Sequence, residues 1–215
     1  MIKLVIFDLD GTLVNAYPAV AQSVNYTLRR LGLPRRTHQE IKRSVGWGDK
    51  RLMATFVGDP LAEKAIRLYR PHHTRALACL GGVRFLAGAK GLLAALGKHG
   101  YKLAIASNRP TKFTMLILKT LGICGCFDMV LCADRAPQPK PHPDILWAIL
   151  KRMRVPAQQA LYVGDMGIDV ECGRRAGVRT VAVSTGSSTA AELRALKPYR
   201  VIHKIAQVKT ILGQQ

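Results

Sequence analysis

Two aspartates separated by one residue follow an apolar run near the start of the chain. The run is Leu4 to Phe7, and it is followed by Asp8, Asp10 and then Gly11. Four apolar residues are too few for a helix and are typical of a buried strand. Because glycine permits a sharp turn, both carboxylates should gather at the carboxyl end of this strand, which is where open α/β sheets bind ligands.

Other polar residues occupy similar positions later in the chain, after apolar runs or in a proline-rich loop. They are Ser107, Asn108, Lys140, Asp165 and Asp169. Each of them alone has an ordinary explanation as a helix cap, a first-turn acid or a solvated loop lysine. Because the carboxyl ends of parallel strands meet at one edge of a sheet, their joint occurrence favours a single site.

Such a set could hold a metal ion and a phosphoryl group. Carboxylates this close repel each other unless a cation joins them, and Mg²⁺ suits an all-oxygen site that a substrate phosphate completes. The Ser107 hydroxyl, the Asn108 backbone N–H and the Lys140 ammonium match the oxygens of a transferring phosphoryl group. Asp8 is the candidate nucleophile of an aspartyl-phosphate mechanism. Asp10 would protonate the leaving oxygen and then deprotonate the attacking water.

Helical periodicity dominates the segment that follows the acidic pair. Helices are expected over 17–31, 37–45, 50–57 and from 60 onward. The last helix should be interrupted or kinked at Pro71, and no strand is expected before Lys102. This is more helix than one crossover needs, so we predict a helical subdomain over 16–82, with hinges near Asn15 and Gly81-Gly82.

The rest of the chain alternates between strands and helices. Helices are expected over 89–98, 111–121, 144–153, 169–176 and 189–195, and strands over 102–106, 128–132, 160–163, 179–183 and 200–202, with a closing helix. This alternation implies right-handed crossovers and a parallel sheet. We therefore predict an α/β core made of residues 1–15 and 83–215.

Composition limits the classes of protein that fit. Apolar residues make up 48% of the 215 and charged residues 21%, so a packed core is expected. The chain has no secretory pattern and no run of eighteen apolar residues, which predicts a cytoplasmic protein without a membrane-spanning helix. The five cysteines lack zinc-site spacing and are expected to be buried free thiols. We interpret His72-His73 as solvated loop residues rather than ligands.

The chain carries 33 basic against 13 acidic residues, a net charge of +20. Such a charge attracts anions, including phosphate esters and nucleic acid. Basic doublets in the predicted helical subdomain, such as Arg29-Arg30 and Lys42-Arg43, make a nucleic-acid-binding protein the alternative from a different class. This alternative is disfavoured, because an acidic site repels a polyanion and no basic stretch alternates with aromatic residues.

The polar residues form the four motifs of a known superfamily: Asp8-x-Asp10-Gly11-Thr12, Ser107-Asn108, Lys140-Pro141 and Gly164-Asp165-x-x-x-Asp169. With these motifs the chain resembles the haloacid-dehalogenase superfamily over nearly the whole predicted core. The resemblance implies a Rossmann-like, doubly wound parallel sheet. It also implies Mg²⁺ held by the Asp8 and Asp165 carboxylates and the Asp10 backbone carbonyl. Ser107 and Lys140 would grip phosphate, and Asp169 would orient the waters of the metal.

The helical insertion over 16–82 resembles the small α-helical cap of one branch of this superfamily. Phosphoglycolate phosphatases are the most similar group, through Phe7–Val14, Ser44–Gly48 and Ser107–Pro110. Asn15-Ala16 and Ala87-Gly88 depart from the usual residues of that group. Trp47 would either face the leaving group of the substrate or pack inside the cap.

The second aspartate separates the reaction types of the superfamily. Dehalogenases and phosphonate hydrolases lack the equivalent of Asp10, and β-phosphoglucomutase-like proteins usually carry a cap histidine where this chain has Val20. Pyrophosphatases need the same core and remain an alternative. The resemblance thus implies a Mg²⁺-dependent phosphatase of a small phosphorylated metabolite, which we predict to be a monomer or a weak homodimer.

Overall fold

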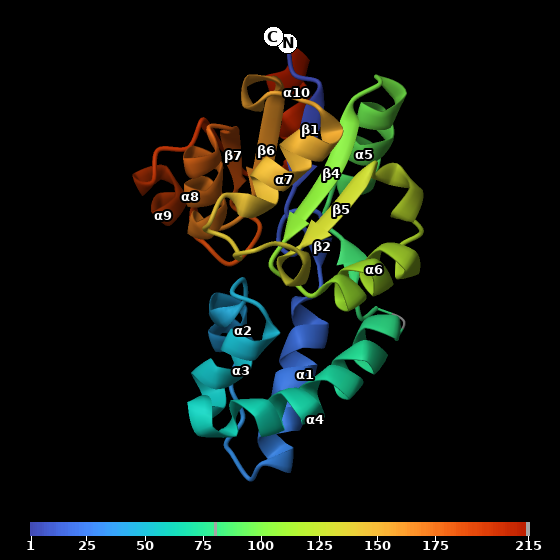
Figure 1. Cartoon of the computed structure of the whole chain (residues 1–215). Coiled ribbons are helices and arrows are strands. Elements are labelled where there is room, and N and C mark those ends of the chain that lie inside the picture. The colour runs from blue at the N-terminus through green and yellow to red at the C-terminus, as the bar shows by residue number, and fades with distance from the viewer. Residues whose placement is uncertain (80, 214–215) are drawn as a thin grey trace.

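A six-stranded parallel sheet organises the computed structural model, which describes residues 1–79 and 81–213 (Figure 1). In space the strands follow the order β5-β4-β1-β6-β7-β8. Their bounds are β1 (Leu4–Phe7), β4 (Lys102–Ser107), β5 (Met129–Cys132), β6 (Ala160–Gly164), β7 (Arg179–Val183) and β8 (Arg200–Ile202). The parallel pairing confirms the predicted α/β fold class. β1, which the acidic pair follows, lies centrally between β4 and β6.

Side chains of the central strands alternate between the two faces of the sheet, as a period of two residues requires. In β1, Val5 and Phe7 belong to the apolar core on one face, and Leu4 and Ile6 to the core on the other. All four side chains are fully buried. A strand that is covered on both faces is a continuous apolar run, which explains why this strand was predictable.

Helices cover both faces of the sheet, so the core is doubly wound. α5 (Ala89–Lys98), α6 (Thr111–Thr120) and α10 (Val208–Gly213) pack on one face, and α7 (Asp144–Met153) and α8 (Gly167–Ala176) on the other. α9 (Ala190–Ala195) packs beside β7 and β8. Short 3₁₀ turns occur at η1 (Cys124–Cys126), η2 (Ala133–Arg135), η3 (Ala157–Gln159) and η4 (Ile205–Gln207). Over the described part of the chain, no helix combines the length and apolar character needed to cross a membrane.

Four further helices form a lobe with an apolar core of its own. They are α1 (Tyr17–Arg30), α2 (His38–Ser44), α3 (Asp49–Val57) and α4 (Asp59–Ala78). Val24, Ile41, Met53 and Tyr69, one from each helix, are buried together. Full burial of a large apolar side chain contributes about 1.5–3 kcal/mol, so this cluster can hold the four helices together. We call α1–α4 the helical lobe and the remainder the core.

α4 runs without a break through Pro71, so of the two predicted outcomes, an interruption or a kink, the interruption is wrong. Pro71 is exposed, whereas Tyr69, His73 and Leu77 are buried on the inner side of the same helix. A proline in a helix removes one backbone hydrogen bond. Here that loss falls on the solvent side, and the packed inner side keeps the helix continuous.

A short two-stranded sheet that the sequence did not predict joins the lobe to the core. β2 (Val14–Asn15) pairs antiparallel with β3 (Arg84–Phe85), with Val14 opposite Phe85. Strands of two residues carry no periodic pattern that a sequence could reveal. Because the two chain crossings lie side by side, they form a narrow stem between the lobe and the core (Figure 1).

The helical lobe lies opposite the carboxyl ends of the strands, and both chain ends lie on the far side of the core (Figure 1). β1 runs from the N-terminus toward the lobe. The residues that directly follow β1, β4 and β6 are therefore placed between the core and the lobe.

The five cysteines are all free thiols, but they are not all buried as predicted. Cys132 and Cys172 are buried and Cys124 is half-buried, whereas Cys79 and Cys126 are exposed. Cys79 and Cys126 are exposed because Cys79 follows the end of α4 and Cys126 lies in the 3₁₀ turn η1, and neither belongs to a packed strand.

Candidate active site

A cavity of about 50 Å³ lies between the carboxyl ends of the central strands and the helical lobe. The core supplies most of the polar lining, namely Asp8, Asp10, Ser107, Asn108, Arg109, Lys140 and Asp169. The lobe supplies Tyr17, Val20, Leu52, Tyr69 and His73. A cavity of this size holds a few water molecules or one group the size of a phosphate. The structure thus brings six predicted site residues to one cavity although they are remote in sequence.

Three aspartates converge beside this cavity. Asp8, Asp165 and Asp169 each place a carboxylate oxygen within 4.8 Å of the others, and all three are buried. Asp165 follows β6 and is fully buried. Gly11 keeps the space beside Asp165 clear, because a Cβ on Gly11 would lie 2.6 Å from Asp165 Oδ2 and the φ of +77° favours glycine.

The crowding of buried carboxylates changes how they ionise. Burial raises the pKa of Asp8 to about 7, with Lys140 acting against this rise and Asp169 adding to it. Burial also raises the pKa of Asp165, and the charges of Asp8 and Asp169 raise it further. Raised pKa values of this kind indicate negative charge that is not fully compensated. The cluster therefore fits a divalent cation.

The oxygens that remain available in this cluster belong to two of its members. Asp8 Oδ2 accepts no hydrogen bond from the described residues, and Asp165 Oδ1 accepts only a long one, 3.3 Å from Thr12 Oγ1. Oxygen ligands and a small number of carboxylates suit Mg²⁺, which keeps several waters or substrate oxygens in its shell. Asp8 and Asp165 would hold such an ion, while the Asp10 backbone carbonyl stays a predicted third ligand.

Asp169 is instead occupied by hydrogen bonds within the core. Its Oδ1 accepts hydrogen bonds from Lys140 Nζ and the Tyr162 hydroxyl, each at 2.7 Å. Its Oδ2 accepts one from the Met166 backbone N–H at 3.0 Å. With both oxygens engaged, Asp169 is placed to orient Lys140 and the neighbouring carboxylates rather than to bind an ion directly.

Lys140 is a fully buried ammonium inside the acidic cluster. Its Nζ donates hydrogen bonds to Asp8 Oδ1 and Asp169 Oδ1 at 2.7 Å, and to the Ala106 carbonyl at 3.0 Å. Burial alone would lower the pKa of Lys140, but the charges of Asp169 and Asp8 raise it above its ordinary value. The ammonium therefore stays charged, and it fixes the orientation of the Asp8 carboxylate.

Binding of Mg²⁺ should stabilise the folded protein more at pH 8 than at pH 6. An ion can join Asp8 only in the carboxylate form, and below its pKa of about 7 a proton must first leave. At pH 8 the Asp8 carboxyl group is mostly deprotonated, so no proton competes with the ion. The stabilisation by saturating Mg²⁺ should therefore be about 1–2 kcal/mol larger at pH 8 than at pH 6. Urea unfolding with and without Mg²⁺ at each pH measures this difference. An equal effect at both pH values would contradict the raised pKa of Asp8.

Asp10 lies apart from the three clustered aspartates and is paired with an arginine of the core. Arg109 Nε donates a hydrogen bond to Asp10 Oδ2 at 2.6 Å, and the side chains are only 8% and 11% exposed. Asp10 Oδ1 is buried and has no hydrogen-bond partner in the part of the chain that the structure describes. An unpartnered carboxylate oxygen beside the cavity is available to exchange a proton with a bound group.

Ser107 and Asn108 follow β4, and the Asn108 side chain reaches the lobe. Asn108 Nδ2 donates hydrogen bonds to the carbonyls of Lys140 and Gly46, both at 3.0 Å, and Asn108 Oδ1 accepts one from the Lys140 backbone N–H at 2.8 Å. The buried Ser107 Oγ accepts a hydrogen bond from the Arg109 backbone N–H at 3.2 Å. The Asn108 side chain therefore joins two core loops and the lobe, a role that the sequence did not predict.

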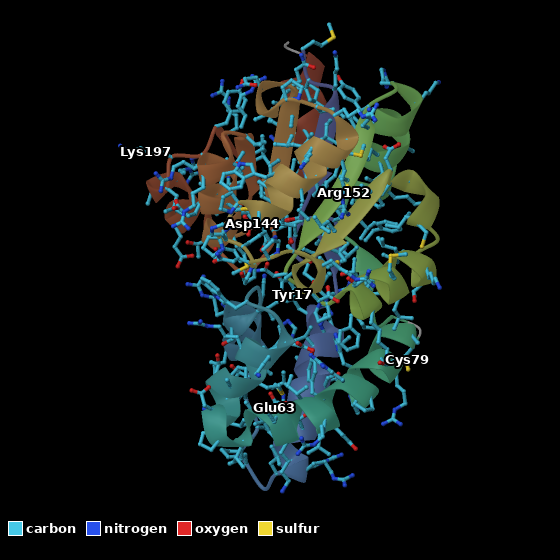
Figure 2. All side chains as sticks on the ribbon, in the orientation of Figure 1. Tyr17, Glu63, Cys79, Asp144, Arg152 and Lys197 are labelled. Carbon is cyan, nitrogen blue, oxygen red and sulfur yellow. The ribbon has the colours of Figure 1, made fainter. Side chains whose placement is uncertain are left out.

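Tyr17, at the start of α1, is a site residue that sequence reasoning missed. It lies where the helical lobe meets the core (Figure 2), and its hydroxyl is 3.4 Å from Asp165 Oδ2. The Ser187 backbone N–H donates to the same oxygen at 2.9 Å. In the sequence, Tyr17 is one more residue at a helix start, and nothing in its spacing indicates a contact with Asp165.

Trp47 and His73 of the lobe do not lie where the sequence predicted. Trp47 is 43% exposed and does not line the cavity, so it neither packs inside the lobe nor faces the site, although Gly46 and Gly48 beside it do line the cavity. His73 is fully buried in α4 instead of lying in a solvated loop. Its neighbour His72 is half-buried on the same helix.

The sequence profile of a family described as haloacid dehalogenase-like hydrolase matches residues 5–183. The chain belongs to this hydrolase family. Its predicted membership is thereby confirmed, and the phosphatase relatives and the solved structure confirm the phosphatase class and the Rossmann-like fold.

Several phosphoglycolate phosphatases are similar to this hydrolase over nearly its whole length. One from Nitrosococcus oceani is 30% identical and covers 99% of this chain and 97% of its own. One from Pseudomonas savastanoi pv. phaseolicola is 32% identical, covering 96% and 78% respectively. The crystal structure of a protein described as a predicted phosphoglycolate phosphatase from Haemophilus somnus matches with a TM-score of 0.91 at 27% identity, over 98% of each chain.

Proposed function

We propose that this hydrolase is a Mg²⁺-dependent phosphatase of a small phosphomonoester resembling 2-phosphoglycolate, and that the phosphoryl group passes through Asp8. The observation that supports this most directly is the placement of two carboxylate oxygens beside one cavity. Asp8 Oδ1 is held by Lys140 while its Oδ2 is available, and Asp10 Oδ1 has no partner among the described residues. One carboxylate is therefore placed for attack and the other for proton transfer.

In the first step, Asp8 attacks phosphorus and the bond from phosphorus to the ester oxygen breaks. Asp10 gives its proton to that oxygen, so the product leaves as an alcohol. Ser107 and Lys140 would hold the remaining phosphoryl oxygens in this step. Mg²⁺, when bound, supplies positive charge that offsets the charge of the carboxylates and the phosphoryl oxygens.

In the second step, a water molecule attacks phosphorus and gives a proton to Asp10. The bond between phosphorus and Asp8 breaks, inorganic phosphate is released, and both aspartates return to their starting forms. Closure of the helical lobe over the cavity would limit the access of other water during the reaction. Residues 16–82 would thus act as a cap that closes over the cavity.

The lining of the cavity supports a small leaving group. Tyr69, Leu52 and Val20 close its lobe side, and the volume is only about 50 Å³. Val20 carries no group able to transfer a proton, which disfavours the β-phosphoglucomutase-like alternative. Pyrophosphate hydrolysis remains the alternative that only an assay separates from this proposal.

The excess of basic residues is spread well beyond this site. Arg29, Arg35 and Arg36 line a groove of the helical lobe together with Tyr26 and His72. The loop after α1 lies at the end of the lobe that is far from the sheet (Figure 1). Of the residues that line the catalytic cavity, only Arg109 and Lys140 carry a permanent positive charge. Phosphate selectivity thus depends on these two cations and the metal, not on the basic groove.

A panel of phosphate compounds tests the proposal. We expect Mg²⁺-dependent release of inorganic phosphate from 2-phosphoglycolate and similar small esters, with kcat/KM at least about 10-fold above that for glucose 6-phosphate or pyrophosphate. Chelation of Mg²⁺ should remove the activity. Preference for pyrophosphate, or full activity in the presence of a chelator, would overturn the proposed function.

A further inference from the structure

We infer that His73 of the helical lobe is a positioning residue for Asp10 and acts through Arg109. This inference rests on the proposed function of Asp10 in proton transfer. Arg109 Nε donates to Asp10 Oδ2 at 2.6 Å, and Arg109 Nη1 lies 2.7 Å from His73 Nε2. The guanidinium therefore bridges a carboxylate of the core and an imidazole of the lobe.

The direction of each hydrogen bond in this bridge follows from its chemistry. A guanidinium only donates, so His73 Nε2 must accept and its proton must lie on Nδ1. Burial and the charge of Arg109 lower the pKa of His73 to about 2, in agreement with a neutral ring. Nδ1 lies 3.3 Å from Ser23 Oγ, whose hydroxyl donates to the Ala19 carbonyl at 2.7 Å. One tautomer of His73 satisfies all these contacts.

Packing from both parts of the molecule holds the His73 ring in place. Tyr69 of the lobe stacks on it with ring centroids 4.8 Å apart, and Phe113 of the core meets it edge-on at 5.0 Å. The ring is fully buried. The acceptor that Arg109 meets is thus fixed only when the lobe packs against the core.

The consequence for Asp10 concerns which oxygen faces the cavity. Arg109 holds Oδ2, and Oδ1 is left without a partner within the described chain. Without His73, the guanidinium of Arg109 loses one of its two anchors and can turn away from Asp10. The Asp10 carboxylate could then rotate, and a misplacement of about 1 Å in a reacting group can cost about 100-fold in rate.

His73 also lines the cavity, so direct contact with substrate is the competing role. The two roles differ in their kinetic signatures. A contact with bound substrate would change KM for every ester in a similar way. A defect in the proton transfer to the leaving oxygen would lower kcat/KM most for esters whose leaving oxygen needs a proton. The later transfer from water to Asp10 is the same for every ester and affects kcat but not kcat/KM.

The test compares two substitutions at this position. His73→Leu removes the acceptor, whereas His73→Gln supplies a side-chain oxygen that can accept from Arg109. Both are assayed with Mg²⁺ on 2-phosphoglycolate, whose leaving oxygen needs a proton, and on p-nitrophenyl phosphate, whose leaving group departs without protonation. We expect His73→Leu to lower kcat/KM about 100-fold on the first ester and less than about 10-fold on the second. His73→Gln should recover at least about a tenth of the original kcat/KM on 2-phosphoglycolate.

His72→Leu is the matched control. His72 is the neighbouring residue and its Nδ1 also lies 3.1 Å from Ser23 Oγ, but it makes no contact with Arg109. The ratio of the two kcat/KM values should therefore stay as in the unaltered protein. Circular dichroism verifies folding, and His73→Phe, which keeps a ring between Tyr69 and Phe113 but has no acceptor, gives a second route to the same signature if His73→Leu does not fold.

Equal losses of kcat/KM on both esters would overturn the positioning role and leave the phosphatase intact. Failure of the unaltered protein to hydrolyse either ester would overturn the proposed function and this inference with it. Selective loss on the alkyl ester, with recovery in His73→Gln, supports the inference.

Discussion

Asp8→Asn is expected to abolish Mg²⁺-dependent phosphate release, with kcat lowered by about 10⁴-fold or more. An amide is a poor nucleophile, so the bond from Asp8 to phosphorus would not form. The substitution also removes one carboxylate from the cluster that would hold the metal. Steady-state kinetics on 2-phosphoglycolate with saturating Mg²⁺ measures the loss.

The same substitution should leave the fold intact, which makes the kinetic result interpretable. Burial and the nearby Asp169 raise the pKa of Asp8, so loss of the negative charge at this position relieves repulsion, while the amide oxygen of asparagine can still accept from Lys140. We expect the free energy of unfolding to change by less than about 2 kcal/mol. Asp59→Asn, at an exposed acid of the helical lobe, is a control that should keep full activity. Retained hydrolysis in Asp8→Asn would exclude Asp8 as the nucleophile.

The core was predictable because its signals are local and repeat. Strands buried on both faces, such as Leu4–Phe7 and Ala160–Gly164, are short apolar runs, and the helices between them keep a period of 3.6 residues. Parallel topology then brings strand ends to one edge without any knowledge of side-chain contacts. This is why Asp8, Ser107 and Asp165 could be assigned to one site before any distance was known.

Contacts between the lobe and the core were not predictable in the same way. A helical pattern shows that α4 has an inner side, but not that His73 on that side meets Arg109 of the core. Adjacent histidines after a proline favour a loop on local grounds, and tertiary packing overrides this preference. The positions of Tyr17 and Trp47 were not predictable for a similar reason. The angle between the lobe and the core decides which lobe residue reaches the cavity.

Lys140→Met is expected to lower both stability and activity. Methionine has a similar length but no charge, so Asp8 and Asp169 would lose the ammonium that donates to each of them at 2.7 Å. Removal of one partner from a buried ion pair leaves an uncompensated buried charge and costs about 3–5 kcal/mol. Urea unfolding in the absence of Mg²⁺ should show this loss, and kcat should fall by at least about 100-fold because Asp8 is no longer oriented.

A double substitution separates charge from packing as the cause. Asp169 is engaged by Lys140, Tyr162 and the Met166 backbone, so Asp169→Asn keeps its shape while it removes one negative charge. If uncompensated charge destabilises Lys140→Met, then Lys140→Met/Asp169→Asn should regain at least about 1 kcal/mol relative to Lys140→Met alone. If the losses of stability in the two single variants simply add in the double variant, the cost of Lys140→Met comes from lost packing and not from uncompensated charge. Added Mg²⁺ should also recover part of the stability of Lys140→Met, because a cation beside Asp8 and Asp165 replaces positive charge that the ammonium supplied.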